Sequence, residues 1–149
     1  MGFLTGKTAI ITGAGRAVLK DGSCGSIGYG IATAYAKEGA NLVITGRNVK
    51  KLEAAKQELE SLYGIKVLTV QADVCAGGDN EATVANVVKQ AVDTFGGIQV
   101  LINNAQASAS GVPLAEHTTE QFDLAIYSGL YAAFYYMKAC YPCLLYTSP

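Results

Sequence analysis

The sequence predicts an α/β fold: a doubly wound parallel sheet, incomplete, with about four strands and four to five helices. Short apolar runs rich in β-branched residues alternate with longer segments whose apolar residues recur at helical spacing. The short runs are apolar throughout, which is typical of strands covered by helices on both faces. Because crossovers between parallel strands are right-handed, the helices are expected on both sides of the sheet.

The first strand is predicted at 7–12, where KTAIIT is a compact apolar run. A helix follows in SIGYGIATAYAKEG, which begins at Ser26 and is closed by Gly39. The next apolar run, NLVITG at 41–46, predicts the second strand. These three segments form the first βαβ unit.

The second helix is predicted to begin at the N-cap Asn48 and to end at Gly64. The run KVLTVQ at 66–71 then predicts the third strand. One face of the helix is apolar and carries Leu52, Ala55, Leu59 and Leu62.

The third helix has the clearest periodicity, with Asp79 or Asn80 available to cap its start and Gly96 following its end. The run IQVLIN at 98–103 predicts the fourth strand. The residues at helical spacing are Val84, Val87, Val88, Ala91, Val92 and Phe95.

The last predicted helix is long and rich in aromatic residues. It opens with a capping box, in which Thr118 is followed three residues later by Gln121. Pro142 is expected to end or kink it, because proline cannot donate the backbone hydrogen bond of a helix interior.

The composition indicates one globular domain and excludes several partner classes. The 149 residues are 50% hydrophobic and 15% charged, with a formal net charge of −1 and no basic block. We therefore expect neither nucleic acid nor a membrane as a partner. The N-terminus has no signal-peptide pattern, and the uncharged run at 124–137 is shorter than the ~20 residues a spanning helix needs. A cytoplasmic protein is expected.

The four cysteines are expected to be free thiols. Their spacing is irregular, and the context is not secretory. Cys140 and Cys143 spell C-x-x-C, but no second pair, nearby histidine or preceding strand supports a metal or redox site. His117, beside a helix cap and without a nucleophile motif, is interpreted as a surface residue.

A glycine-rich stretch between the first strand and the first helix predicts a nucleotide site. Gly13 directly follows the strand, Gly15 lies two residues on, and Gly28 stands at the helix start. Glycines there permit a tight turn and a close approach to a pyrophosphate, which a helix N-terminus attracts. The order strand, glycines, helix is that of a Rossmann-like dinucleotide site, with a purely structural turn as the alternative.

The residue after the second strand bears on the choice of cofactor. In NAD-binding sites of this type an acidic side chain there takes the ribose hydroxyl. This chain has Gly46 at that position, followed by Arg47. A guanidinium can bind a 2′-phosphate that an acid would repel. The sequence therefore favours NADP(H) over NAD, with a solvent-exposed arginine as the alternative.

Four features together resemble the short-chain dehydrogenase/reductase family over about residues 5 to 142. They are TG after the first strand with SIG at the helix start, ADV at 72–74, NNA at 103–105, and the long aromatic helix. In that family the long helix commonly joins subunits, so the resemblance implies a homo-oligomeric parent.

The resemblance implies roles for the matching residues. Asp73 would receive the adenine amino group, with Val74 beside the ring, although a turn former at the strand end is the alternative for Asp73. Asn104 and Ala105 would lie near the adenine ribose. The residues bordering the phosphates and ribose would be Gly13, Ser26, Ile27 and Gly28.

The chain departs from the family pattern at several points. Residues 16–24 look like an insertion in the glycine loop, whose Arg16 and Lys20 either add phosphate contacts or lie on a surface loop. Ser26 replaces the middle glycine, which is similar to the enoyl-acyl carrier protein reductases. Gly129 stands where the family has an asparagine that holds a proton-relay water, and Gln106 where it has glycine.

No catalytic residue is assigned in this chain. In the family a serine and a Tyr-x-x-x-Lys pair do the acid–base work, and here no tyrosine precedes a lysine by four residues. The pair is expected beyond the chain end, so the tyrosines of the long helix are interpreted as packing residues. The 149-residue chain itself is expected to be inactive.

Three functions stay open at this point. The first is a fragment of an oxidoreductase that transfers hydride between NADP(H) and a carbonyl or alcohol. The second is an enoyl thioester reductase, suggested by Ser26. The third is a non-catalytic dinucleotide-binding module, suggested by Gly129.

The last seven residues are expected to be a non-native tail. CLLYTSP at 143–149 matches the translation of a transposon-end adapter used in sequencing libraries. Residues 1–142 would then be the N-terminal part of a single dinucleotide-binding domain.

Overall fold

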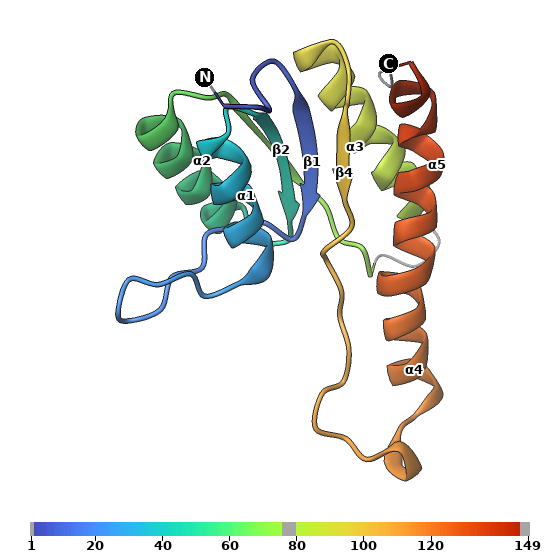
Figure 1. Ribbon diagram of the computed structural model, residues 1–149. Helices are drawn as coiled ribbons and strands as arrows, with labels where there is room; N and C mark the ends of the chain where they lie inside the picture. The colour runs from blue at the N-terminus through green and yellow to red at the C-terminus, as the bar shows by residue number, and fades with distance from the viewer. Residues whose placement is uncertain (1, 76–79, 147–149) are drawn as a thin grey trace.

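Four parallel strands form one sheet in the order β3-β2-β1-β4 in the computed structural model, which describes residues 2–75 and 80–146 (Figure 1). The central strand β1 pairs with β2 on one side and with β4 on the other, and Ile10 lies opposite Val43 and Leu101. The predicted doubly wound sheet is confirmed. The strands are β1 Thr8–Thr12, β2 Asn41–Gly46, β3 Val67–Gln71 and β4 Val100–Ile102.

Strand β4 is shorter than the predicted run 98–103. At its start the Thr8 N–H is bound by the Gln99 side chain at 2.7 Å rather than by a backbone carbonyl. At its end the Asn104 N–H donates to the Thr12 hydroxyl at 3.0 Å. Side-chain bonds therefore occur at both ends of β4, while at its start the Gln99 N–H still donates to the Thr8 carbonyl at 3.0 Å.

Helices α1 (Ile27–Lys37) and α2 (Val49–Tyr63) cover one face of the sheet. The predicted ends of α2 are confirmed: the Asn48 side chain accepts from the Lys51 N–H, and Gly64 ends the helix with a φ of 66°. The buried side chains between this pair and the sheet include Tyr29, Ala32, Leu42, Ile44, Leu52 and Leu59.

Helices α3 (Asn80–Phe95) and α5 (Ala132–Leu145) cover the other face. Asn80 lies inside α3 and donates its side-chain amide to the Val74 carbonyl at 3.1 Å, while the alternative cap Asp79 lies outside the described residues. The core on this face includes Ile10, Val43, Val84, Val87, Ala91, Ile98, Tyr136 and Cys140.

One long helical run connects α4 (Thr119–Ala125) through the π-helical segment η3 (Ile126–Tyr131) to α5. It follows a 3-10 turn, η2 (Leu114–Glu116), and its predicted capping box of Thr118 and Gln121 is present. Of the two effects expected of Pro142, an end of the helix is wrong, because α5 continues to Leu145, and a kink stays a prediction. In Figure 1 the α4 end extends past the carboxyl ends of the strands.

Within residues 2–75 and 80–146, no helix combines the length and the apolar character needed to cross a bilayer. The same part of the chain brings together no group of three or more His, Cys, Asp or Glu side chains that could hold a metal ion.

Candidate functional site

The turn after β1 is built around glycines that lie too close to their neighbours for a side chain. Gly13 has a φ of 71°, and its N–H donates to the Thr45 carbonyl at the end of β2 at 2.9 Å. A Cβ on Gly28 would lie 2.2 Å from the Gly13 carbonyl oxygen. The first turn of α1 therefore touches the turn after β1, which only glycine at 28 allows.

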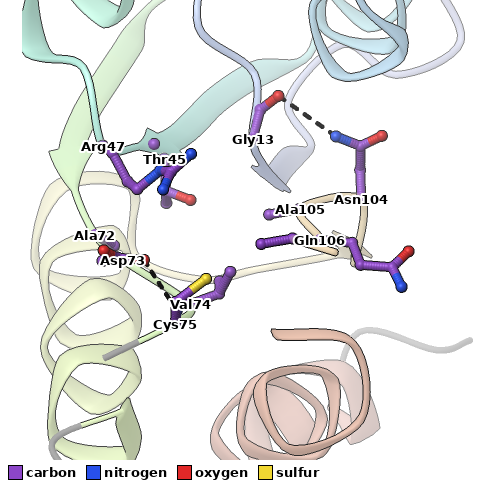
Figure 2. A pocket seen from close by; sticks show the side chains of 12 residues that line it. Gly13, Thr45, Arg47, Ala72, Asp73, Val74, Cys75, Asn104, Ala105 and Gln106 are labelled. Atoms are coloured by element: carbon purple, nitrogen blue, oxygen red, sulfur yellow. Dashed lines mark hydrogen bonds between the residues drawn. The ribbon is translucent and has the colours of Figure 1, made fainter. Parts of the chain in front are cut away.

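The segment after β4 is fastened to the same turn by Thr12 and Asn104. The Thr12 hydroxyl accepts from the N–H groups of Asn104 and Ala105, at 3.0 and 2.9 Å. The Asn104 side chain donates to the carbonyls of Thr12 and Gly13, at 2.9 and 3.4 Å (Figure 2). Sequence reasoning missed Thr12, whose role depends on a segment about 90 residues away in the chain.

These elements enclose a cavity of about 220 Å³ at the carboxyl ends of the strands, which we call the Asp73 cavity. Figure 2 shows Arg47 and Asp73 on one side of it and Gly13, Asn104 and Ala105 on the other. The lining residues are Gly13, Thr45, Gly46, Arg47, Ala72, Asp73, Val74, Cys75, Asn104, Ala105, Gln106 and Ala107.

Asp73 both shapes the turn after β3 and faces this cavity. Its Oδ1 accepts from the Cys75 N–H at 2.9 Å. Burial and, next, the Asp73 carboxylate raise the pKa of the Cys75 thiol, so this sulfur is neutral near pH 7. The turn-former interpretation and the ligand interpretation of Asp73 are compatible, because Asp73 both bonds within the turn and lines the Asp73 cavity.

A second cavity, of about 240 Å³, lies on the other side of Arg47 and is called here the Lys51 cavity. It shares Gly13, Gly46 and Arg47 with the Asp73 cavity, so the two meet at the end of β2. It is lined by Gly13, Gly15, Ala17, Ser26, Gly46, Arg47, Asn48, Lys51 and Leu52.

The predicted binding residues divide between the two cavities, with two exceptions. Gly15 and Ser26 line the Lys51 cavity, and the buried Ser26 hydroxyl has no hydrogen-bond partner among the described residues. Gly28 lines neither and acts through close packing. Ile27 also lies outside both, and its side chain is 77% exposed beside the glycine loop.

The insertion is a small hairpin that projects from the sheet (Figure 1). Val18 and Cys24 form an antiparallel bridge, and the Gly25 N–H donates to the Ala17 carbonyl at 2.7 Å. Arg16 forms an ion pair with Glu58 of α2, which lowers the pKa of that carboxyl. Arg16 thus fastens the loop to α2, a role that neither alternative named, and Lys20 lines neither cavity.

Gln106 and Gly129, two positions at which the chain departs from the family pattern, lie next to each other. They line a third cavity, of about 120 Å³, called the Gly129 cavity, which lies between the segment after β4 and η3. A Cβ on Gly129 would meet the Gln106 side chain, with Nε2 at 3.5 Å. Figure 2 shows Gln106 directing its amide away from Arg47 and Asp73. Gln106 is larger than the glycine of the family pattern, and Gly129 is smaller than its asparagine. The Gln106 side chain thus occupies the space beside Gly129.

Ser128 fixes this contact. Its hydroxyl accepts from the Ala107 N–H at 2.9 Å and donates to the Leu124 carbonyl at 2.7 Å. The segment after β4 is therefore bound to the π-helical segment, a type of helix irregularity that is frequent at functional sites.

The tyrosines of the long helix differ in their surroundings. Burial raises the pKa of Tyr136 to about 12, and the pKa of the neighbouring Cys140 thiol also rises to about 12 through burial. Tyr127 and Tyr131 stack on each other at 5.0 Å and are partly exposed. Tyr136 is a packing residue, as predicted, whereas Tyr127 and Tyr131 lie on an open surface.

The known proteins similar to this chain include a dehydrogenase and an oxidoreductase. The family model described as short chain dehydrogenase matches residues 7–148. The chain is 60% identical over 144 residues to the 12alpha-hydroxysteroid dehydrogenase of a Clostridium species, a match that covers 97% of this chain and 53% of that protein. It is 37% identical over 140 residues to the uncharacterized oxidoreductase YhxC of Bacillus subtilis, covering 93% and 44%. The chain spans about half the length of the curated relatives it matches.

Two solved structures similar to this chain contain a nicotinamide cofactor. L-sorbose reductase from Gluconobacter frateurii, complexed with NADPH and L-sorbose, matches with a TM-score of 0.80 and 30% identity over 97% of this chain and 49% of that one. An alcohol dehydrogenase from Thermococcus sibiricus, complexed with 5-hydroxy-NADP, matches with a TM-score of 0.81 and 30% identity over 95% and 54%.

Proposed function

Because this chain belongs to the short-chain dehydrogenase family, we propose that it is the cofactor-binding part of an oxidoreductase that transfers hydride between NADP(H) and a carbonyl or alcohol substrate. The observation that carries the choice of cofactor is the end of β2. Arg47 stands there where the Asp73 and Lys51 cavities meet, and Gly46 supplies no carboxylate.

The residues present fit a dinucleotide. The glycine turn with positive φ at Gly13 and the close contact at Gly28 leave the first turn of α1 open to a phosphate. Two adjoining cavities of about 220 and 240 Å³ offer space on either side of Arg47. The Gln71 side-chain amide donates to the Arg47 carbonyl at 3.1 Å. This bond fixes the Arg47 backbone and leaves the guanidinium available to bind a phosphate.

Each part of the site has a proposed task. Asp73 accepts the adenine amino group, with Val74 against the ring and Asn104 and Ala105 forming the wall near the ribose. Arg47 binds the 2′-phosphate by charge-assisted hydrogen bonds. Ser26 and the two glycines Gly13 and Gly15 border the pyrophosphate and ribose. When bound, the nicotinamide supplies or accepts the hydride.

The acid–base chemistry is placed outside this chain. Tyr136 has a pKa raised to about 12 by burial, so it is a poor proton donor or acceptor near neutral pH. We place the serine and the Tyr-x-x-x-Lys pair in the remaining half of the parent and expect the 149-residue chain to be inactive.

Nucleotide binding tests the cofactor assignment. Wild-type chain titrated calorimetrically is expected to bind NADPH at least about tenfold more tightly than NADH, since charged hydrogen bonds of this kind are worth about 1.5–3 kcal/mol. Arg47→Ala should remove most of that preference and leave NADH affinity unchanged. A preference for NADH, or no binding of either nucleotide by folded chain, would contradict the proposal.

The proposed substrate of the parent is a hydroxysteroid or its ketone. Its support is the 60% identity to a 12alpha-hydroxysteroid dehydrogenase, twice the identity to the sorbose reductase. The full-length parent is expected to turn over hydroxysteroids with NADP more efficiently than simple alcohols, and to be inactive on enoyl thioesters with NADPH. Turnover of the enoyl thioester instead would favour the reductase suggested by Ser26, and no turnover of any substrate would favour the binding module suggested by Gly129.

A further inference from the structure

Lys51 is placed directly against the glycine loop by two contacts. Its carbonyl accepts from the Arg16 N–H at 2.8 Å. A Cβ on Gly15 would lie 3.1 Å from the Lys51 Cβ. The first turn of α2 therefore rests on the loop, and the Lys51 side chain leaves the backbone at that contact.

The charged side chains that line the Lys51 cavity are all positive. Arg47 and Lys51 both line it, and no carboxylate does. The carboxylates of α2 that might neutralise them are engaged elsewhere: Glu53 accepts from the Thr69 hydroxyl at 2.6 Å, and Glu58 pairs with Arg16. Within the described ranges neither Arg47 nor Lys51 forms an ion pair. Two unpaired cations on one cavity indicate an anionic ligand.

We propose that Lys51 is a second cationic ligand of the cofactor 2′-phosphate and sets the preference for NADP(H) jointly with Arg47. The proposal rests on the proposed function above. A phosphate monoester, with a second pKa of about 6, carries close to two negative charges near neutral pH. One guanidinium balances one of them, and the ammonium of Lys51 balances the other. The N-terminus of the fifteen-residue helix α2 adds a favourable dipole at the same place.

The neighbouring Lys50 provides a matched control. It is exposed, has the same charge, lies in the same helical turn, and lines neither the Lys51 cavity nor the Asp73 cavity. A general loss of positive potential would affect both lysine variants equally. A specific contact would affect only Lys51.

The experiment uses two nucleotides that differ only in the 2′-phosphate. Adenosine 2′,5′-bisphosphate and adenosine 5′-monophosphate are titrated calorimetrically into wild-type chain, Lys51→Ala, Lys51→Arg, Lys50→Ala and Arg47→Ala. Lys51→Ala is expected to lower affinity for the bisphosphate roughly tenfold at low salt and to leave the monophosphate within about twofold. Lys51→Arg should retain most of the affinity, and Lys50→Ala should match wild type.

The substitution leaves the local fold in place, because the bonds to Arg16 and Asn48 use the backbone of Lys51. Far-UV circular dichroism and the thermal midpoint check this for each variant. Equal affinities of Lys51→Ala and Lys50→Ala for the bisphosphate overturn the inference. An equal loss of affinity for both nucleotides in Lys51→Ala also overturns it, because that result would place Lys51 at the 5′-phosphate.

If the assignment of NADP(H) itself is wrong, the measured affinities follow a different pattern. If wild-type chain does not distinguish the bisphosphate from the monophosphate, the assignment of NADP(H) fails and the role of Lys51 fails with it. If Arg47→Ala loses the bisphosphate while Lys51→Ala does not, NADP(H) stands and only the role of Lys51 is overturned.

Discussion

At the scale of single residues, the site depends on contacts that a side chain would block. Gly13 and Gly28 allow the turn after β1 and the first turn of α1 to touch, and the atom that a new Cβ on Gly28 would strike is a backbone oxygen. Backbone cannot rotate away as a flexible side chain can. Gly28 is therefore required for the shape of the loop before any ligand binds.

Substitution of Gly28 by alanine is expected to lower the free energy of unfolding by about 1–3 kcal/mol, the usual cost of overpacking. Denaturant titration measures it, and NADPH affinity should fall in parallel because the loop shifts. Gly30→Ala in the same helix is the control, since its Cβ would meet only the Cys24 sulfur at 3.3 Å. There the gain in helix propensity of up to about 1 kcal/mol offsets the contact. Equal stability of the two variants would contradict the packing account.

Residues whose partners are far away in the sequence could not be assigned from sequence alone. Gly13 and Arg47 are predicted because each directly follows a strand, where parallel sheets gather their ligands, whereas Asp73 is predicted from the resemblance of its ADV segment to the family. Arg16 was undecided because its partner Glu58 lies 42 residues away. Lys51 has no local sequence signal, because its place in the cavity depends on how α2 packs on the glycine loop.

At the scale of elements, boundaries set by local chemistry were predicted well. The cap Asn48, the terminator Gly64 and the capping box at Thr118 act within one helical turn, so a short window of sequence contains the whole signal. The β2 strand also has its predicted bounds at 41–46.

Pro142 shows where local signals fail. Proline leaves the Lys138 carbonyl without its helical donor, which by itself favours an end to the helix. Past the proline, however, Cys143 and Leu144 pack against the core cluster that contains Tyr136 and Cys140. Packing on the sheet outweighs the missing hydrogen bond. The free energy gained by this packing cannot be predicted from the proline and the residues next to it in the sequence.

At the scale of the whole molecule, the long helical run has an open apolar face. Its outward side chains are large and exposed by 39–90% of their area. Monomeric proteins rarely leave a contiguous patch of this kind uncovered. These residues are Phe122, Tyr127, Leu130, Tyr131, Phe134, Met137 and Tyr141, together with Leu145 and Tyr146 of the segment 143–149 that is predicted to be non-native.

We propose that this face joins copies of the parent into a homo-oligomer. The double variant Leu130→Gln with Phe134→Gln is expected to shift the parent toward monomer at micromolar concentration, as measured by size-exclusion chromatography with light scattering. Phe3→Gln, which changes a more exposed aromatic residue elsewhere, is the control and should leave the mass unchanged. An oligomer that survives the double variant would place the interface on another surface.

The three-residue length of β4 has a consequence for association by strand pairing. Among the described residues β4 pairs only with β1, so the backbone groups along its other side form a border of the sheet. Such borders can recruit strands from foreign chains and seed aggregates. With only Val100–Ile102 in extended pairing, this border offers a template too short for a stable intermolecular ladder. Because very short edge strands are one way in which native sheets limit pairing with other chains, the length of β4 itself protects this border against growth into fibres.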